Sequence, residues 1–475
     1  MTKSLARPLP LYLLLCAAAA LWIDFSRIHL GQTSDSLIPV LVSLQHWTPF
    51  YWEQSRFGML VPLLALPFND PLVNLLVQDG LMIFSGLAAV GLLARFFMGS
   101  RAWFAAACGS CACTIVFLAE PLRCDYFLAQ PYGISFSLGL GALLLLERGN
   151  TWKRWSIGLG MILLASWVNL GVGPALLALV IMRWVGQRLT WPRAPVRLIL
   201  LLVAGTATGL ALERAAPFRD HRVTRLAPAD QWLPGCEALV SNLLHQSGPG
   251  YRLALLVLPV AAVIALLTFT GRRRTRAART LGSMLAGAAL LTLLAASSRW
   301  AAVNGHTPRY AYMALLTLQT GLVAVIAQRC CLFTNSSRER GRPRLRVGLV
   351  ECLAACCLLT AAAWTYGLPS PATVRACLHE RCGGATDDIL RAGCTHIAGH
   401  YWRVWPAVFH ANWTLHQHGS TQQVWGVTYR SLPTKAHWAT ANPATASVAV
   451  LGGHENAENI LNDFVPSLRV AVAGR

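Results

Sequence analysis

Long apolar stretches, separated by short polar or basic connections, recur along most of the chain. A helix needs about 20 apolar residues, at roughly 1.5 Å each, to cross about 30 Å of membrane hydrocarbon. Eleven stretches are predicted to form such spans: 9–24, 71–94, 102–119, 130–146, 155–169, 173–186, 196–212, 252–270, 280–298, 309–327 and 346–366. The pattern therefore predicts a polytopic α-helical membrane protein whose transmembrane domain occupies residues 1–366.

The composition agrees with a membrane protein and excludes an ordinary soluble one. Of the 475 residues, 55% are hydrophobic and 13% are charged, whereas soluble domains carry about 25% charged residues. In a soluble chain the formal net charge of +20 would indicate a nucleic-acid partner. Here the basic residues stand between apolar stretches, so they are read as topology markers and no nucleic-acid partner is expected.

The distribution of Lys and Arg orients the chain. Cytoplasmic connections carry an excess of these residues, and the excess falls on alternate connections if the N-terminus is cytoplasmic. The strongest markers are Arg272–Arg274 and the run from Arg338 to Arg346. The first span begins with Lys3 and Arg7 like a signal peptide, but no cleavage site follows it, so a membrane anchor is predicted. An odd number of spans then puts the C-terminus outside.

Residues 367–475 are long and polar enough to form a small extracytoplasmic α/β domain. Apolar patterning predicts strands at 395–398, 423–429 and 447–451 and a helix at 404–416. The aromatic residues of 401–405 suit stacking on sugar faces, although aromatic residues at helical spacing more often form a core.

The first outer loop, 25–57, holds the strongest candidate for catalysis. Asp35 follows Thr33-Ser34 and precedes an apolar run that begins at Leu37, which places a carboxylate at the start of an interfacial helix. Such a carboxylate can take a proton from an incoming hydroxyl as a general base. Asp and Ser are also favoured helix N-caps. Cap and base are both open for Asp35, and the two roles are compatible.

The apolar run of 12 residues at 57–68 contains Pro62 and Pro67. It is too short and too broken to span a bilayer, so it is predicted to lie in the outer interface or to enter the bilayer and return. Together with the helix after Asp35 it gives two interfacial elements within 25–68. These elements would cover a cavity between the spans, and a covered cavity that faces outward suits a lipid-borne substrate.

A short outer loop after the third span carries Glu120, Arg123 and Asp125, and it leads to Tyr132 at the start of the next span. Two carboxylates and a guanidinium in one short loop provide both acceptors and donors of hydrogen bonds. These four residues are predicted to bind substrate.

The spans at 155–169 and 173–186 are short, so the break between them is predicted to lie below the outer surface. Irregular backbone at that depth is tolerated where it lines a cavity or is buried in protein. Asn169, in this break, is predicted to contact substrate at the cavity floor, with simple loop formation as the more ordinary alternative.

The sequence His306-Thr307-Pro308-Arg309-Tyr310 precedes the core of a late span. An Arg at the outward start of a helix can hold a phosphate through two guanidinium contacts. The alternative for Arg309 is extension toward the membrane interface without a ligand. His306 and Tyr310 are predicted to bind substrate beside it.

Asp79 lies inside the second span, and an acidic residue within a membrane is a functional candidate. It can relay protons, as in a transporter. The alternative is a structural partner such as Arg95.

Three of the five cysteines predicted to lie outside are in the C-terminal domain, and disulfides persist in that compartment. A Cys377–Cys382 or a Cys382–Cys394 bridge is predicted. A zinc site that also uses His379 and His396 is the alternative, although the spacing matches no common ligand pattern.

The order of these elements resembles the GT-C class of membrane glycosyltransferases, and most closely its bacterial members that take sugars from polyprenyl-phosphate donors. The resemblance rests on the first span, the outer loop with Asp35, two interfacial elements, a ladder of spans, the His-Thr-Pro-Arg-Tyr sequence and the outer C-terminal domain. It implies that Asp35, or in second place Asp24, acts as base or binds the acceptor. It also implies a second acidic residue, Glu120 or Asp125, and a contact of Arg309 with the donor phosphate.

The resemblance implies sugar transfer to a lipid or glycan acceptor at the outer face of a bacterial cytoplasmic (inner) membrane. Asp35 would deprotonate the acceptor hydroxyl, and Arg309, Arg56 or Arg123 would meet the charge of the departing phosphate. No glycine-rich phosphate loop follows a strand, which agrees with a lipid donor. A divalent cation stays open, because isolated carboxylates can hold one but the sequence shows no ligand cluster.

The main alternative is a transporter or flippase of lipid-linked sugars that would use Asp79 and the short spans. Transporters concentrate polar groups near the midplane, whereas here most of them stand at the outer ends of the spans. A non-catalytic scaffold for envelope assembly is the third hypothesis. The distribution of polar residues favours the enzyme.

Overall fold

The structure, a computed structural model, describes residues 8–98, 102–147, 151–187, 194–216, 218, 225–335, 343–438 and 447–451. The basic markers Lys3, Arg7 and the run from Arg338 to Arg342 lie outside these ranges.

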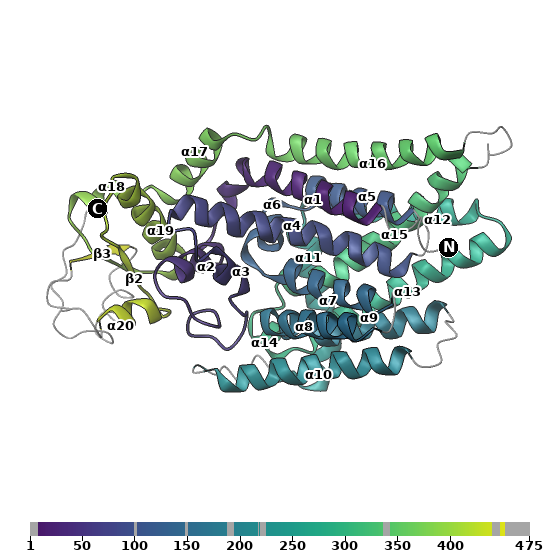
Figure 1. The fold of residues 1–475 in the computed structure, drawn as a ribbon, viewed down its shortest axis with the longest axis horizontal. Helices are drawn as coiled ribbons and strands as arrows, with labels where there is room; N and C mark the ends of the chain where they lie inside the picture. The colour runs from purple at the N-terminus through teal and green to yellow at the C-terminus, as the bar shows by residue number, and fades with distance from the viewer. Residues whose placement is uncertain are drawn as a thin grey trace.

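The chain is mostly helical, and its long helices lie side by side in one bundle (Figure 1). Within the described residues, six helices are long and apolar enough to cross a membrane: α4 (Pro71–Phe97), α10 (Ala194–Ala215), α12 (Gly248–Leu267), α13 (Gly271–Ala296), α15 (Tyr312–Asn335) and α16 (Pro343–Tyr366). The segment Glu120–Ala129 and α7 (Tyr132–Glu147) meet at 62° and make a seventh if they form one broken span. These helices indicate a multi-pass membrane protein.

All eleven predicted stretches contain helix, but the described helices give six or seven candidate spans by length and composition instead of eleven. The other four stretches form helices of 16 or 17 residues: α1 (Pro8–Asp24), α5 (Ala102–Phe117), α8 (Trp152–Val168) and α9 (Val172–Gln187). These four helices agree with the predicted stretches to within about three residues in length, but at 16 or 17 residues they are shorter than the roughly 20 that a span needs.

Short helices connect the long ones at the end of the bundle that carries the first loop. Those of the first loop are η1 (Arg27–Gly31), α2 (Ser34–Leu44) and α3 (Leu60–Ala65), and α6 (Glu120–Cys124) continues into the π-helical turn η2 (Asp125–Ala129). Later connections form η3 (Ala229–Gln231), α11 (Trp232–Gln246), α14 (Arg299–Val303) and η4 (Pro308–Ala311). The run at 57–68 therefore contains a helix of only six residues, α3, as its two prolines lead us to expect.

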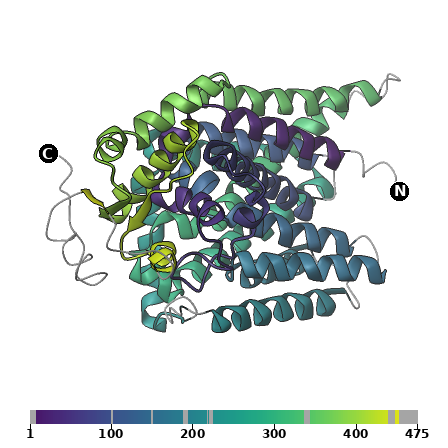
Figure 2. The same cartoon turned by 60° about the vertical axis from the view of Figure 1, so that its left-hand side comes forward.

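The C-terminal part builds a small α/β unit at the end of the bundle opposite the N-terminus (Figures 1 and 2). Its elements are α17 (Pro371–Cys382), α18 (Thr386–Arg391), β1 (His396–Gly399), α19 (Tyr401–Gln417), β2 (Trp425–Val427), α20 (Leu432–Trp438) and β3 (Val448–Leu451). The strands form one parallel sheet in the order β2-β1-β3, with His396 opposite Trp425 and Val448. The three predicted strands and the predicted helix are confirmed.

The first loop and the C-terminal unit share one hydrophobic core. Ile38 and Trp52 of the loop are fully buried against Val404 and Trp405 of α19, and the ring centroids of Trp52 and Trp405 lie 5.5 Å apart. Burial of large aromatic side chains is a strong stabilising term. Residues 34–59 are therefore packed together with the C-terminal sheet, although a long chain of spans separates them in sequence.

The predicted disulfides are wrong for this structure. Cys377, Cys382 and Cys394 are buried free thiols. Cys377 and Cys382 belong to one helix, α17, which holds them five residues apart, and Cys394 Sγ accepts a weak hydrogen bond from Ser447 Oγ at 3.7 Å. The alternative zinc site is also not formed, because no described group of possible metal ligands contains these cysteines.

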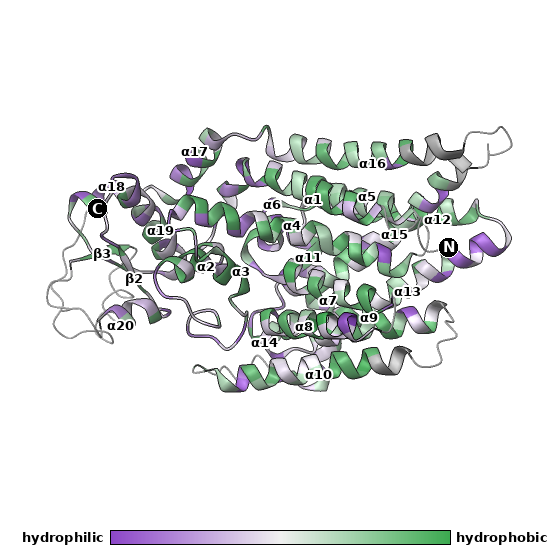
Figure 3. Ribbon diagram, in the orientation of Figure 1, coloured by the Kyte–Doolittle hydropathy of each residue, from purple (hydrophilic) through white to green (hydrophobic). Residues whose placement is uncertain are grey.

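Hydrophobic residues dominate the middle of the bundle, and hydrophilic residues gather toward its two ends (Figure 3). The long helices are predominantly hydrophobic, and the basic first turns of α13, which hold Arg272–Arg274, lie at the end opposite the sheet. The first loop and the C-terminal unit therefore lie at one end of the bundle and the cluster of Arg residues at the other.

Gly91 provides a test of the packing in the bundle. A Cβ atom at Gly91 of α4 would lie 2.0 Å from Cε1 of Tyr12, a side chain with no exposed surface. We expect Gly91→Ala to lower the free energy of unfolding by about 1–3 kcal/mol through overpacking. Thermal unfolding of the purified protein in detergent measures the change.

Gly160→Ala is the matched control, because a Cβ atom at Gly160 of α8 meets nothing within 4 Å. Alanine is about 0.5–1 kcal/mol better than glycine inside a helix, so Gly160→Ala should be neutral or slightly stabilising. Equal unfolding temperatures for the two variants would contradict the packing of α1 against α4.

Candidate functional site

Asp35 lies in the first turn of α2 but does not cap it. The N-cap is Thr33, and a capping box with Ser36 satisfies the helix start, with the Thr33 N–H donating to Ser36 Oγ at 2.9 Å. The predicted capping role of Asp35 is therefore wrong, because the helix begins one residue before it. Its carboxylate is left for contacts beyond the helix.

Three donors from distant parts of the chain reach the Asp35 carboxylate. Tyr401 Oη donates to Oδ1 at 2.6 Å. Gln130 Nε2 and Arg309 Nη1 each donate to Oδ2 at 3.4 Å. The side chains of Asp35 and Arg309 are each 18% exposed, so the pair is sheltered but reachable from solvent.

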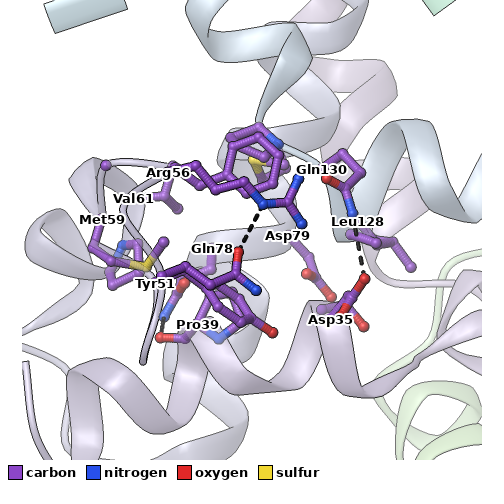
Figure 4. A pocket seen from close by; sticks show the side chains of 18 of the residues that line it. Asp35, Pro39, Tyr51, Arg56, Met59, Val61, Gln78, Asp79, Leu128 and Gln130 are labelled. Carbon is purple, nitrogen blue, oxygen red and sulfur yellow. Dashed lines mark hydrogen bonds between the residues drawn. The ribbon is translucent and has the colours of Figure 1, made fainter. Parts of the chain in front are cut away.

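Asp35 stands at the wall of a cavity that holds about 600 Å³ of empty space, part of it open to solvent (Figure 4). The wall comes from the first loop, from α4, from the end of η2 and from the C-terminal unit. The lining residues that carry polar side chains are Asp35, Ser36, Tyr51, Gln54, Arg56, Gln78, Asp79, Gln130 and Arg430. Pro39, Phe57, Met59, Val61, Pro62, Met82 and Leu128 supply most of the apolar surface.

Several polar atoms on this wall have no protein partner. Gln54 Nε2, Gln78 Oε1 and Gln130 Oε1 are buried and have no hydrogen-bond partner in the described part of the chain. A buried polar group without a partner costs roughly 1–3 kcal/mol. Water or a polar ligand in the cavity would satisfy these amides, so the cavity suits a ligand with many hydroxyl or phosphate oxygens.

The guanidinium groups of Arg56 and Arg430 line the cavity, whereas Arg309 lies outside its lining and meets it through the contact with Asp35. Arg56 donates to Gln54 Oε1 at 2.7 Å and lies 4.4 and 4.2 Å from the ring centroids of Phe57 and Trp300. Arg430 lies between 5.2 and 5.4 Å from the rings of three tyrosines, Tyr51, Tyr401 and Tyr429. Guanidinium groups held on aromatic faces are positioned for an anion, and phosphate fits their planar donors.

Tyr51 and Tyr401 form a linked pair of phenols next to Asp35. Their hydroxyl oxygens lie 2.8 Å apart. Burial, and after it the charge of Asp35, raises the pKa of Tyr51 above its usual range. Burial, and after it the charges of Tyr51 and Asp35, raise the pKa of Tyr401 well above its usual range. Both phenols therefore keep their protons, and Tyr401 donates a proton in its hydrogen bond to Asp35.

The parallel sheet brings Tyr401 and Arg430 to the cavity. Tyr401 follows β1 and Arg430 follows β2, and the carboxyl ends of neighbouring parallel strands meet at one edge of a sheet. Gly399 makes the turn between β1 and α19, with φ at +140° and a Cβ position only 2.0 Å from Leu451 O. Only glycine fits this turn, so it fixes where Tyr401 starts the helix.

Glu53 ties the first loop to the same edge of the sheet. Its carboxylate accepts from Lys435 Nζ at 2.8 Å and from the Ser431 N–H at 3.2 Å. Glu53 and Phe57 have positive φ, 54° and 60°, which L-residues rarely adopt. Such backbone persists when the surroundings hold it, and here it carries Arg56 and Phe57 to the cavity wall.

Asp125, Tyr132 and Tyr310 border the Asp35–Arg309 pair. Asp125 interacts electrostatically with both members of the pair. The Tyr132 ring packs edge-on against Phe57 with centroids 6.2 Å apart, and Arg309 lies 5.3 Å from the ring centroid of Tyr310. The structure therefore brings these three predicted residues together with Asp35, Arg56 and Arg309.

Glu120 and Arg123 do not line the cavity. Arg123 Nη1 donates to Ile115 O at 2.6 Å, and the guanidinium lies 5.4 Å from the Tyr366 ring. The short helix α6 turns Arg123 toward the end of α5 and away from Asp35. Binding of substrate by Glu120 and Arg123 is therefore a prediction that this geometry does not favour.

Asn169 and His306 also lie away from the cavity lining. Asn169 Oδ1 accepts from the Gly171 N–H at 3.0 Å, which is the loop-forming alternative. His306 has φ at 50°, and its ring lies against Gly235 of α11, where a Cβ atom would come within 2.8 Å of His306 Cε1. Local turn geometry explains both residues.

Asp24 belongs to a second polar cluster, below the cavity, with His29 and Asp79. Their possible ligand atoms lie within 4.8 Å of one another, and all three side chains are buried. Asp79 also lines the cavity. This cluster could not be predicted as a ligand group, because its members come from the end of α1, from η1 and from α4.

Three residues of the site were not predicted from the sequence: Arg430, Tyr51 and Gln130. Tyr401 was predicted only as one of several aromatic residues that could stack on a sugar. The sequence pattern pointed to two of these four positions, because Tyr401 and Arg430 come within three residues of the ends of predicted strands in one small domain. Tyr51 and Gln130 stand in loops without a distinctive pattern.

No family model matches the sequence, and no curated protein or solved structure shows significant similarity to it. The function is therefore inferred from the residues of the cavity.

Tyr401→Phe tests the hydrogen bonds around Asp35. The change removes the hydroxyl that contacts Asp35 at 2.6 Å and Tyr51 at 2.8 Å, and it should lower the free energy of unfolding by about 1–3 kcal/mol. Tyr310→Phe is the control, because Tyr310 Oη is buried with no hydrogen-bond partner among the described residues, and it should be neutral. Thermal unfolding followed by tryptophan fluorescence compares them, and equal effects would refute the assigned contacts.

Proposed function

We propose that this protein is an integral-membrane glycosyltransferase of the GT-C type. It transfers a sugar from a polyprenyl-phosphate donor to a lipid or glycan acceptor at the outer face of a bacterial cytoplasmic membrane. The observation that supports this most is the pairing of Asp35 with Arg309 at 3.4 Å beside a cavity with further guanidinium groups. One side chain of the pair can accept a proton and the other can hold a phosphate.

In the proposed reaction, Asp35 takes the proton of an acceptor hydroxyl. The acceptor oxygen forms a bond to the anomeric carbon, and the bond between that carbon and the phosphate oxygen breaks. The polyprenyl phosphate leaves with the bonding electrons, and Arg309, Arg56 and Arg430 stabilise its charge. Tyr401 and Gln130 orient the base through their hydrogen bonds to Asp35.

A lipid donor agrees with the composition of the cavity wall. Pro39, Met59, Val61 and Met82 are apolar, and they lie beside the polar atoms of Asp35 and the glutamines. An apolar surface next to a row of cationic donors suits a molecule with a lipid tail and a phosphate head. A glycine-rich turn at the start of a helix is one common site for nucleotide phosphates, and the residues that line the cavity do not include such a turn.

The proposed topology has eleven spans, a cytoplasmic N-terminus and an extracytoplasmic C-terminal unit. Arg272–Arg274 and the sheet lie at opposite ends of the bundle (Figure 3), and positively charged connections favour the cytoplasmic side. The cavity would then open at the outer leaflet.

The second candidate is a transporter or flippase of lipid-linked sugars. The cluster of Asp24, His29 and Asp79 inside the helical bundle favours it, because buried acidic and histidine groups form proton relays in transporters. Asp35 is not a member of that cluster, so a change at Asp35 separates the two functions.

Asp35→Asn keeps the shape of the side chain and removes the base. We expect the rate of sugar transfer to fall at least about 100-fold. The assay uses membranes that contain the protein and a panel of radiolabelled polyprenyl-phosphate hexoses and pentoses, and it measures label in the acceptor fraction.

Asp388→Asn is the matched control, because Asp388 is exposed on α18 and pairs with Arg391 at 2.9 Å. It should transfer sugar at the wild-type rate. An Asp35→Asn protein that folds and transfers at the wild-type rate would contradict the proposal. Sugar-lipid translocation in proteoliposomes by both the wild type and Asp35→Asn, without transfer, would support the transporter.

A further inference from the structure

The buried cluster of Asp24, His29 and Asp79 is the strongest unexplained group in the described part of the chain. Asp24 ends α1, His29 lies in η1, and Asp79 is a buried residue in the third turn of α4. The three side chains are at most 3% exposed. Their possible ligand atoms lie within 4.8 Å of one another.

The cluster has two carboxyl groups, and within the residues that the structure describes no Lys or Arg forms a salt bridge with them. Asp24 and Asp79 lie next to His29, Asp79 accepts a hydrogen bond from Gln32, and the two carboxyl groups interact with each other. Two buried carboxylates without a cation are strongly disfavoured, because desolvation and mutual repulsion add. A doubly charged cation would balance two carboxylates.

His29 is oriented as a metal ligand. Its Nε2 donates to the backbone oxygen of Asp24 at 2.6 Å, so the lone pair lies on Nδ1. Nδ1 faces Asp79 Oδ2 at 3.5 Å. A ligating histidine commonly donates its other ring N–H to a backbone carbonyl in this way, which fixes the tautomer and the direction of the lone pair.

Asp24 supplies an independent observation. Its side chain is 1% exposed, and its Oδ1 has no hydrogen-bond partner in the described ranges. This oxygen lies 3.7 Å from Nε2 of His29, the nitrogen that donates to the Asp24 backbone oxygen. A buried carboxylate oxygen without a donor is costly, and a cation at the cluster would satisfy it.

Gln32 closes the group on the remaining side. Its Nε2 donates to Asp79 Oδ2 at 2.5 Å and lies 3.2 Å from His29 Nδ1, while its Oε1 accepts from Ser36 Oγ at 2.5 Å. The amide therefore stands where the lone pairs of His29 and Asp79 converge. Rotation of the Gln32 amide would expose both ligand atoms and could add its own oxygen.

We propose that Asp24, His29 and Asp79 bind a divalent transition-metal ion of the Zn²⁺ type. One imidazole nitrogen and two carboxylate oxygens are ligands that Zn²⁺ accepts at about 2.0–2.2 Å, with a fourth position left for water or for Gln32. Asp79 lines the cavity, so the ion reaches the site from there. The inference goes beyond sugar transfer and does not require it.

Zinc binding to the purified full-length protein tests the site. The protein is prepared in detergent without a polyhistidine tag, incubated with Zn²⁺, desalted and measured by inductively coupled plasma mass spectrometry. We expect about one tightly bound Zn²⁺ per chain, a higher unfolding temperature with Zn²⁺, and loss of both after treatment with a chelator.

His29→Gln and Asp79→Asn should each weaken the binding of Zn²⁺ at least 10-fold and abolish the thermal shift. The control Asp388→Asn carries the same kind of change on an exposed acid and should bind like the wild type. Size-exclusion chromatography checks that each variant is folded.

X-ray absorption spectroscopy at the zinc edge provides a second measurement. It uses the wild type alone, so it remains valid if the variants fail to fold. Extended fine structure should show nitrogen and oxygen neighbours at about 2.0–2.2 Å and no sulphur at about 2.3 Å. Sulphur neighbours would assign the ion to the cysteines and overturn the proposal. Absence of stoichiometric Zn²⁺ in the wild type, or equal binding by folded His29→Gln and Asp79→Asn, would also overturn it.

Discussion

The hydrogen bonds to the Asp35 carboxylate join three parts of the chain that are far apart in sequence. Tyr401 comes from the start of α19 in the C-terminal unit, Arg309 from η4 just before α15, and Gln130 from the break before α7. A sheltered carboxylate is stable only when donors surround it, so these contacts hold the first loop, the helical bundle and the C-terminal unit in one arrangement. The cavity lies between these three parts, so it depends on their staying in place.

Local signals made part of this site predictable. Asp35 precedes an apolar helical run and Arg309 follows a proline at a helix start, and both patterns are visible in a few residues. The strands at 395–398 and 423–429 were visible too. Arg430 directly follows the second of these strands, but its place at the cavity depends on which parallel strands are neighbours, and packing across the whole domain sets that strand order.

The remaining differences have the same origin. Arg123 and Glu120 share a loop with Asp125, but α6 and η2 turn them to different sides, and the sequence does not show that turn. By length and composition the described helices give six or seven candidate spans where the sequence predicts eleven, because four of the apolar helices have only 16 or 17 residues. Asp24, His29 and Asp79 meet only because α1 packs against α4.

The most direct test is the structure of the full-length protein in a lipid nanodisc with a polyprenyl-phosphate sugar, determined by electron cryomicroscopy. The phosphate should lie within about 3.5 Å of the guanidinium of Arg309, Arg56 or Arg430, with the sugar between the phosphate and Asp35. A donor bound at another face of the bundle, with Asp35 open to bulk solvent, would contradict the account.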